Sequence, residues 1–337
     1  MAMLLVNFPG DHAYVYEALR HSAWNGFTAA DLVFPAFLFI MGASVALSPR
    51  GGIETAGDRS KAAGRIMGRA ARLIGLALGL TLLSYLLTDD PTFRLWGVLQ
   101  RIGVCYAAVG LLSLYASARS QWMTIVGILV GYSILLVGFG GVSLEGNPAS
   151  RLDTALFGPL LRQYDPTTGI GHDPEGLVST FPAIATALLG YRAGVWLRER
   201  RTRRLVGWSV GLTVIGVLWS LVLPLNKNLW TPSFAVFTAG LSIMIMVVAH
   251  GLIDRKSWPA LAEDFGRNAI VAYIGSEFLA EALYLAGLWA PAYRHGFEWM
   301  APMTGGELPS LLFAVAYVLV WAGILRFMAW RGWRVRI

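Results

Sequence analysis

The stretch from His21 to Leu47 reads HSAWNGFTAADLVFPAFLFIMGASVAL, and it passes from a polar loop into a long apolar run. An apolar run near 20 residues is typical of a transmembrane helix. Two titratable residues stand at its entrance, because His21 lies in the loop and Asp31 opens the run. Ionisable side chains cost free energy when they lie in a membrane segment, so they are usually functional there. The stretch therefore predicts a membrane helix with a candidate functional site at its mouth.

Composition extends this reading to the whole chain, in which 56% of the 337 residues are hydrophobic and 14% are charged. We therefore expect an all-α polytopic membrane protein, with residues 1–337 forming a single transmembrane domain. The first of about ten expected spans is too short to cross a bilayer, which suggests that the chain starts inside a helix or that its true start lies upstream. The expected apolar segments are 1–9, 30–48, 67–88, 96–117, 122–140, 177–197, 205–224, 230–252, 268–287 and 308–330.

The distribution of Lys and Arg predicts the orientation, because cytoplasmic loops of membrane proteins carry an excess of both. With the loop at 49–66 inside, 19 of the 27 basic residues fall on the cytoplasmic side, including the run RERRTRR at 198–204. The C-terminus is then cytoplasmic. The segments expected outside are 10–28, 89–95, 141–176, 225–229 and 288–307.

Three pairs of glycines have the spacing that often marks close helix contacts in membranes: Gly75/Gly79, Gly127/Gly131 and Gly207/Gly211. The net charge of +7 follows from the arginine-rich inner loops and gives no reason to expect nucleic-acid binding. The one cysteine, Cys105, excludes an internal disulfide. The chain has no HExxH or P-loop motif, and the scattered outer histidines give no support for a metal site.

Polar residues at or within the expected spans are candidates for a shared cavity that opens outward. They are Asp31, Arg101, Asp173, Glu175, Asn226, Lys227, Asn228 and Glu277. Each also has a plainer explanation. An interfacial histidine such as His21 is often only solvated, Asp31 can complement the helix dipole, and Arg101 can be a structural partner for Asp31 or Glu277.

Several blocks of the chain resemble the catalytic membrane domain of the heparan-α-glucosaminide N-acetyltransferase family. They appear in the family's order and cover nearly the whole chain. The blocks are LLVNFPGD (4–11), RHSAWNGFTAADLVFPAFLFIMGASVALS (20–48), LWGVLQRIGVCY (95–106), DPEGLVSTFPAIATALLGYRAG (173–194), LPLNKNLWTPSF (223–234) and FGRNAIVAYIGSE (265–277).

The resemblance implies a transmembrane acyltransferase that moves acetyl from cytosolic acetyl-CoA to an amino sugar across the membrane. The family's catalytic histidine and the asparagine ending its first helix carry over onto His21 and Asn7. This chain lacks the family's polar S-x-D-x-x-R-G stretch and its luminal domain, so the lysosomal address and polysaccharide substrate do not carry over. We expect a bacterial inner-membrane relative that acts on a glucosamine-type acceptor, and the family suggests a homodimer.

Roles for the other residues follow from position. Asp31 would hold the imidazole of His21, as the acid does in a catalytic triad, and Asn7 or the 226–228 turn would bind the developing oxyanion. The residues expected to bind the acceptor are Asp173, Glu175, Asn226, Lys227, Asn228 and Glu277. Those expected to bind acetyl-CoA, with no metal, are Arg101, Arg267 and Asn268. Arg50, Arg65 and Arg69 are further candidates for its phosphates.

Two other functions remain open at this point. A sugar or amino-sugar transporter would use the same cavity without chemistry, and its hallmarks are broken helices near the midplane and inverted repeats. A non-catalytic assembly subunit would have no need for polar residues to converge on a cavity.

Overall fold

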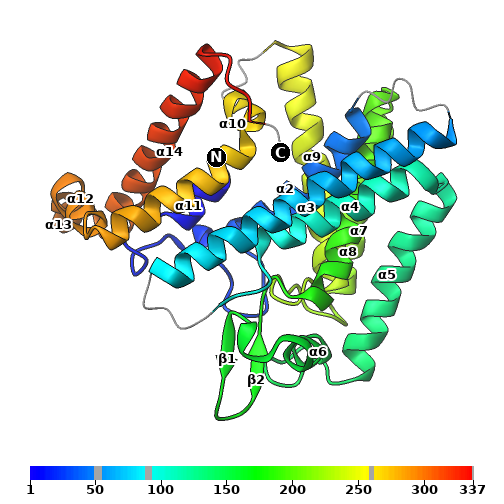
Figure 1. The fold of residues 1–337 in the computed structure, drawn as a ribbon, viewed down its shortest axis with the longest axis horizontal. Helices are drawn as coiled ribbons and strands as arrows, with labels where there is room; N and C mark the ends of the chain where they lie inside the picture. Colours follow the sequence, from blue (N-terminus) through cyan, green and yellow to red (C-terminus); the bar gives the residue numbers. More distant parts are fainter. Residues whose placement is uncertain (49–54, 88–92, 258–261, 336–337) are drawn as a thin grey trace. The chain divides into compact units, whose positions relative to one another are not determined.

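The computed structural model describes residues 1–48, 55–87, 93–257 and 262–335 (Figure 1). The chain is mostly α-helical, as expected for an all-α membrane protein. It divides into two compact units. Unit 1 comprises Met1–His21, Thr28–Val33 and Gly251–Ile337, and unit 2 comprises Ser22–Phe27 and Phe34–His250. The expectation of a single domain over 1–337 stays a prediction.

Unit 1 is built from the two ends of the chain. Its long helices are α11 (Ala269–Leu285) and α14 (Glu307–Trp330). Its shorter elements are α1 (Ala2–Asn7), η1 (Glu17–Leu19), α10 (Glu263–Arg267), α12 (Trp289–Gly296), η4 (Glu298–Met300) and α13 (Ala301–Thr304). The π-helical segment η3 (His250–Arg255) leads into it.

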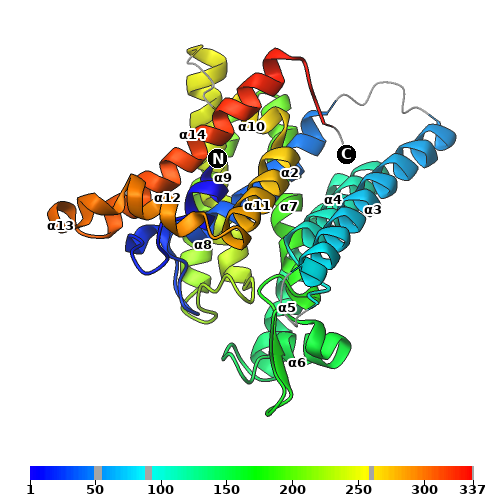
Figure 2. The ribbon, with the colours of Figure 1, turned by 60° about the vertical axis from the view of Figure 1, so that its left-hand side comes forward.

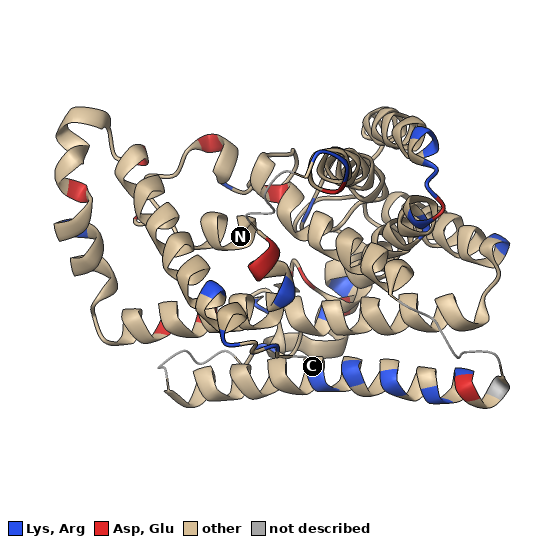
Figure 3. Ribbon diagram, turned by 90° about the horizontal axis from the view of Figure 1, so that it is seen from above, with Lys and Arg blue, Asp and Glu red and all other residues tan. Residues whose placement is uncertain are grey.

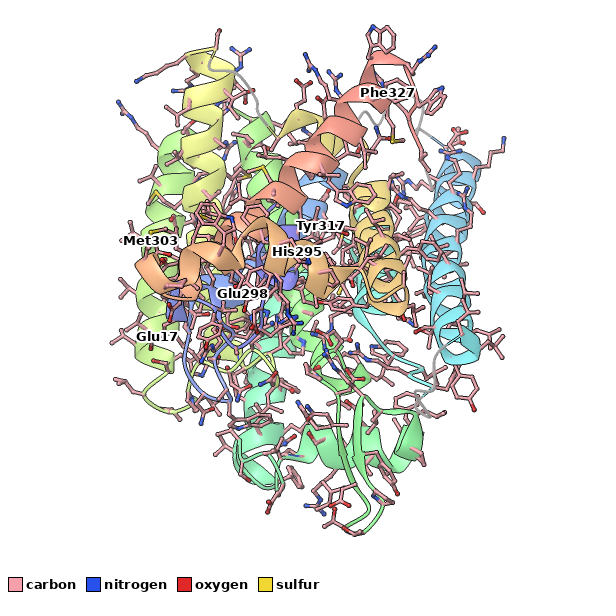
Figure 4. The ribbon with its side chains drawn as sticks, turned by 90° about the vertical axis from the view of Figure 1, so that its left-hand side faces the viewer. Glu17, His295, Glu298, Met303, Tyr317 and Phe327 are labelled. Carbon is pink, nitrogen blue, oxygen red and sulfur yellow. The ribbon has the colours of Figure 1, made fainter. Side chains whose placement is uncertain are left out.

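The core of unit 1 is largely aromatic. Phe8, just after α1, lies 5.0 Å from the ring of Tyr317 and 6.3 Å from Trp289, measured between ring centroids. The Tyr317 hydroxyl donates to the carbonyl of Ser276 at 2.7 Å, which ties α14 to α11. Figure 4 labels Tyr317 and Phe327 along α14. Aromatic pairs at these distances add stabilisation beyond their buried area, so they hold α1 against the C-terminal helices.

Unit 2 contains most of α2 (Ala29–Leu47) and the helices that follow it. These are α3 (Ala56–Leu87), α4 (Val98–Tyr115), α5 (Ala118–Gly138), α6 (Pro148–Phe157), α7 (Leu177–Arg198), α8 (Thr202–Trp219) and α9 (Pro232–Ala249). A short turn, η2 (Gly158–Leu160), follows α6. Helices α3 and α4 run side by side, as do α8 and α9 (Figures 1 and 2).

Helix α7 is the central helix of unit 2, in contact with α4, α5, α6, α8 and α9 and buried along most of its length. It also crosses α2 closely at two glycines. A Cβ added at Gly42 would lie 1.9 Å from the carbonyl oxygen of Ala187, and one at Gly190 would lie 2.0 Å from that of Phe39. Only glycine lets the two backbones approach this closely.

The expectation for the three glycine pairs was wrong. Within the described residues, a Cβ added at any of the six would meet no atom within 4 Å. The close contacts use glycines at other positions, because residue spacing alone does not say which helix face meets a neighbour.

Helix α3 already begins at Ala56, inside the segment 49–66 that was expected to be a loop. Thr55 and Asp58 bond reciprocally at its start, since the Thr55 backbone N–H donates to the Asp58 carboxylate and the Asp58 N–H donates to the Thr55 hydroxyl. This is a capping-box arrangement. Arg59 and Lys61 therefore lie on a helix, which a search for apolar runs cannot detect.

A small hairpin within 141–176 was also missed. Strands β1 (Gln163–Asp165) and β2 (Ile170–His172) pair antiparallel, with Gln163 opposite His172. The turn between them reads PTTG, and Gly169 adopts a positive φ of 66°. Pro and Gly at such spacing are turn signals.

Each of the ten expected apolar segments coincides with a helix. Six stretches in the described residues are long and apolar enough to cross a membrane: Ala29–Leu47, Gly57–Leu87, Val98–Tyr115, Ala118–Gly138, Pro232–Arg255 and Glu307–Trp330. The pair α11 and α12, bent by 89°, makes a seventh if it counts as one span. Helices α7 and α8 fall outside this set, and α7 is surrounded by other helices, so its surface need not be as apolar as one that faces lipid.

Candidate functional site

A histidine–carboxylate pair lies at the mouth of α2, within unit 1. The Nδ1 atom of His21 is 2.9 Å from Oδ1 of Asp31. The imidazole is 42% exposed, whereas the carboxylate is fully buried. The second oxygen of Asp31 accepts hydrogen bonds from the backbone N–H of Thr28 at 3.1 Å and from its hydroxyl at 3.2 Å. The carboxylate is thus fixed by the helix start and presents one oxygen to the imidazole.

This geometry combines the two explanations of Asp31 that the sequence left open. The Asp31 carboxylate accepts from the backbone N–H of Thr28 at the first turn of α2, which is one half of a capping box, and it also contacts His21. A carboxylate that accepts from Nδ1–H fixes the tautomer and places the imidazole lone pair on Nε2. An imidazole held in this way and open to solvent can take a proton or carry an acyl group.

The residues directly after His21 are anchored in unit 2. The indole N–H of Trp24 donates to the carbonyl of Val142 at 2.7 Å. The side-chain amide of Asn226 donates to Oδ1 of Asn25 at 3.0 Å, and the backbone N–H of Gly26 donates to the carbonyl of Leu225 at 2.8 Å. The WNG motif and the PLNKN turn, 201 residues apart between Asn25 and Asn226, are therefore in direct contact.

A buried ion cluster lies at the start of the central helix α7. Arg94 bonds Asp173 through two nitrogens, at 2.9 Å and 2.5 Å, and contacts Glu175 at 2.5 Å. The side chain of Asp173 is fully buried, and that of Glu175 is 9% exposed. A bidentate arginine–carboxylate contact is among the strongest hydrogen-bonded pairs in proteins. Asp173 and Glu175, expected to bind the acceptor, are thus joined by an arginine.

The neighbouring charges explain how the buried Glu175 stays ionised. Burial by itself would raise the pKa of Glu175, but the positive charge of Arg94, aided by Arg101 and Lys227, outweighs it and holds the pKa below its ordinary value. Burial by itself would lower the pKa of Arg94. The contacts with Asp173 and Glu175 outweigh burial and raise the pKa of the guanidinium above the usual range. Lys227 of the PLNKN turn therefore lies within electrostatic reach of Glu175.

Arg101 enters the same region from α4 and is fully buried. One of its terminal nitrogens donates to the carbonyls of Pro174 and Gly176 at 3.0 Å and 3.2 Å and to the hydroxyl of Ser179. Its guanidinium carbon lies 5.0 Å from the ring centroid of Trp230, a cation–π distance. Arg101 therefore fixes the loop before α7. Arg101 is in unit 2, whereas Asp31 and Glu277 are in unit 1.

His172 ends the hairpin and adjoins the WNG motif. Its Nδ1 is 2.7 Å from the hydroxyl of Ser150, and its ring meets that of Trp24 edge-on at 5.0 Å. Burial lowers the pKa of His172 to about 4. One helical turn beyond Ser150, burial raises the pKa of Asp153 to about 6, although its carboxylate accepts from the backbone N–H of Val178. At neutral pH, His172 is uncharged.

The buried neutral His172 predicts a loss of stability in acid. The unfolded chain takes up a proton at His172 near pH 6.5, whereas the folded chain does so only near pH 4. The free energy of unfolding should therefore fall by about 3 kcal/mol as the pH drops across that interval. The raised pKa of Asp153 has the opposite effect on the free energy of unfolding. The folded chain takes up a proton at Asp153 near pH 6 and the unfolded chain only near pH 4, so this group adds stability as the pH falls between those values.

The measurement is thermal unfolding in detergent from pH 7.5 to 4, for the wild type and for His172→Asn. Asn can still accept from Ser150 but cannot titrate. The difference between the two proteins cancels the contribution of Asp153. Equal pH dependence in both would contradict the assignment to His172.

The remaining expected site residues have local roles in unit 1. Asn268 is 1% exposed and ties the C-terminal segment to the start of α11, since it donates to the carbonyl of Trp333 and accepts from the N–H of Val335. Arg267 is exposed and pairs with Glu263 at 2.5 Å. Asn7 ends α1 partly buried, with no side-chain hydrogen bond to the part of the chain that the structure describes, and Glu277 is partly buried on α11.

In unit 2, Lys227 and Asn228 are partly buried beside the fully buried Asn226. Of the further candidates for coenzyme A, Arg65 and Arg69 are exposed on α3. Arg50 lies outside the described residues. Throughout the described ranges, no group of three or more His, Cys, Asp or Glu side chains is arranged to hold a metal ion.

Sequence reasoning missed four residues of the site. Arg94 was counted only as an outer basic residue, and no local signal links it to acids 79 and 81 positions away. Ser150 and Asp153 lie on a helix that apolar runs do not reveal. Asn25 could have been found from the sequence, because it stands in the quoted motif four residues after His21.

The helices and these contacts define a multi-pass membrane protein with an imidazole–carboxylate pair at the mouth of an apolar helix. The family model described as "Heparan-alpha-glucosaminide N-acetyltransferase, catalytic" matches residues 1–221. The chain therefore belongs to this family, as the motifs indicated.

Two relatives are named as heparan-alpha-glucosaminide N-acetyltransferases. The human protein is 30% identical over an alignment of 337 residues. The alignment covers 82% of this chain and 50% of the human protein. The mouse protein is 28% identical over 343 residues, covering 82% of this chain and 51% of its own length. The chain thus spans about half the length of the curated relatives it matches, and their names make the family one of N-acetyltransferases.

Proposed function

We propose that this protein is a transmembrane N-acetyltransferase that moves acetyl from cytosolic acetyl-CoA to a glucosamine-type amino sugar on the other side of the membrane. The observation that carries the proposal is the 2.9 Å contact between His21 Nδ1 and the buried Asp31 carboxylate, with the imidazole 42% exposed. Family membership supplies the class of reaction.

The reaction needs a group that handles one proton or one acetyl. In direct transfer, the acceptor nitrogen attacks the thioester carbon, the C–N bond forms and the C–S bond breaks. The nitrogen loses its proton to Nε2 of His21, which returns it to the leaving thiolate. In the covalent route, Nε2 attacks the thioester carbon, the C–S bond breaks and the coenzyme A thiolate leaves. The amine then takes the acetyl group from Nε2, and the freed Nε2 accepts the proton that the nitrogen loses. In both routes Asp31 stabilises the positive imidazole.

The other residues take supporting roles. Asn7 is proposed as the oxyanion donor. Six residues are each proposed to contact the acceptor: Asp173, Glu175, Asn226, Lys227 and Asn228 of unit 2, and Glu277 of unit 1. The residues proposed to bind acetyl-CoA are Arg101, Arg267 and Asn268. The ion pairs from Arg94 to the buried Asp173 and Glu175 hold both carboxylates in place, which supports a role for them in binding the acceptor.

A direct test uses membranes that contain the protein. Acetyl-CoA should be consumed, and free thiol released, only when an amino sugar is added. Consumption that does not depend on the acceptor would argue against transfer to a sugar. Flux of amino sugar across sealed vesicles without acetyl-CoA would favour the alternative, a sugar or amino-sugar transporter.

The proposed topology has about ten spans, a cytoplasmic C-terminus and an inner-membrane location, and the proposed assembly is a homodimer. Cysteine labelling checks the topology. The single native cysteine, Cys105, is buried, so its background should be low. We expect Arg59→Cys to react with an impermeant reagent only from the cytoplasmic side, and Glu145→Cys only from the outside. Both native residues are exposed. Reaction of Glu145→Cys from the cytoplasm alone would contradict the orientation.

A further prediction concerns Asn25, which links the loop after His21 to Asn226. Replacing Asn25 by Leu removes the acceptor of the 3.0 Å bond, whereas Asn25→Asp keeps it. Small displacements of a catalytic group can cost about 10²-fold in rate. We expect kcat to fall by about 10- to 100-fold in Asn25→Leu, with the KM for acetyl-CoA unchanged.

Asn25→Asp is the matched control and should retain most of the rate. Steady-state kinetics with varied acetyl-CoA give both parameters. An equal loss in the two variants, or no loss in either, would remove Asn25 as a positioning residue.

A further inference from the structure

The first half of α3 carries an exposed row of basic side chains. Figure 3 shows Lys and Arg along this half and none along the second half of the helix. Lys61, Arg65, Arg69 and Arg72 recur at intervals of four, four and three residues, so they fall within about 80° of one another around the helix axis. We call these four residues the α3 basic stripe. All four side chains are exposed.

The stripe has no acidic partner within the described residues, since none of its members forms an ion pair there. Arg69 lies over the ring of Tyr106 at 4.9 Å, and Arg72 donates to the carbonyl of Gly68 in its own helix. Neither contact is an ion pair. The stripe therefore presents four exposed cations along about 17 Å of helix.

The length of α3 places the stripe at the edge of a membrane. The helical stretch Gly57–Leu87 has 31 residues, which is about 47 Å of helix, whereas a hydrocarbon core is about 30 Å thick. Only 17% of its most apolar window is buried in the protein, so much of its surface faces lipid. With the apolar half in the bilayer, the stripe lies at the level of the headgroups.

We propose that the α3 basic stripe binds negatively charged phospholipid headgroups. Its charge complements theirs, and basic residues at a membrane surface attract anionic lipids. A single phosphorylated ligand such as coenzyme A fits less well, because the cations are spread along an open helix surface. The proposal rests on the membrane topology proposed above and not on the acetyl transfer.

The test is native mass spectrometry of the full chain in detergent with equal amounts of phosphatidylglycerol and phosphatidylcholine. The wild type should retain phosphatidylglycerol preferentially. Each neutralised cation should lower that preference about fivefold, so Arg65→Gln with Arg69→Gln should nearly abolish it. Arg59→Gln is the matched control, because Arg59 is exposed on the same helix about 120° from the middle of the stripe.

Three outcomes would overturn the proposal. The wild type could bind both lipids equally. Arg59→Gln could lose as much preference as Arg65→Gln alone, which would mean that only net charge matters. The stripe variant could keep its lipid preference but lose binding of coenzyme A, which would assign the stripe to the donor. Thermal unfolding of each variant without added lipid shows whether it is folded. Arg65→Lys with Arg69→Lys keeps both charges and should keep the preference for phosphatidylglycerol.

Discussion

The His21→Ala variant is expected to lose acetyl transfer while it keeps its fold. The His21 imidazole is 42% exposed, so its removal costs little buried area. Loss of a general base typically lowers the rate by about 10²- to 10⁴-fold, and a covalent route would lose more because its intermediate could not form. Release of free thiol from acetyl-CoA in the presence of glucosamine measures the rate.

Asp31→Asn is the informative companion of that variant. The amide can still accept from Thr28, but it presents a donor to His21 Nδ1 and so favours the wrong tautomer. The corresponding change in a Ser–His–Asp triad lowers kcat by about 10⁴-fold. Unchanged turnover in His21→Ala would show that the histidine is only a solvated loop residue. Turnover lost in His21→Ala but intact in Asp31→Asn would restrict the role of Asp31 to its hydrogen bonds with Thr28.

Incubation with labelled acetyl-CoA in the absence of acceptor separates the two chemical routes. Label on the wild type that is missing from His21→Ala supports an acetyl-histidine. A wild type that transfers acetyl but never retains label leaves direct attack, with His21 as the base.

The Arg94→Met variant is expected to be severely destabilised. It leaves the carboxylates of Asp173 and Glu175 buried without their shared partner. Breaking a buried pair by removing one member typically costs about 3–5 kcal/mol. Methionine keeps much of the side-chain volume, so the loss would report on charge and not on a cavity. The measurement is thermal unfolding in detergent at pH 7.

Removing the stranded charges should reverse the effect. In the Arg94→Met background, Asp173→Asn with Glu175→Gln should recover part of the stability, because the two buried acids then carry no charge, although the buried Arg101 loses the acids near it. Arg94→Lys should lie between wild type and Arg94→Met, since Lys keeps the charge but lacks the planar fork. An Arg94→Met protein that unfolds at the wild-type temperature would mean that the cluster is solvated and contributes little.

The sequence by itself determined the ten helices that lie on apolar segments, and the family. Apolar runs coincide with helices at all ten expected positions, because the preference of an apolar segment for a helix in a membrane is a local property. His21 and Asp31 could also be paired from the sequence, since they lie ten positions apart on either side of a helix start. The same local reading missed the start of α3, where charged residues form a helix that hydropathy cannot register.

Only the tertiary structure decided which distant residues meet. Arg94 joins Asp173 and Glu175 across about 80 positions, and Asn226 joins Asn25 across 201. Likewise, Gly42 and Gly190 make the close helix crossing, whereas the regularly spaced glycine pairs do not. These contacts depend on which face of each helix packs against its neighbours. That choice is set by the packing of the whole helix bundle, and no short segment carries a signal for it.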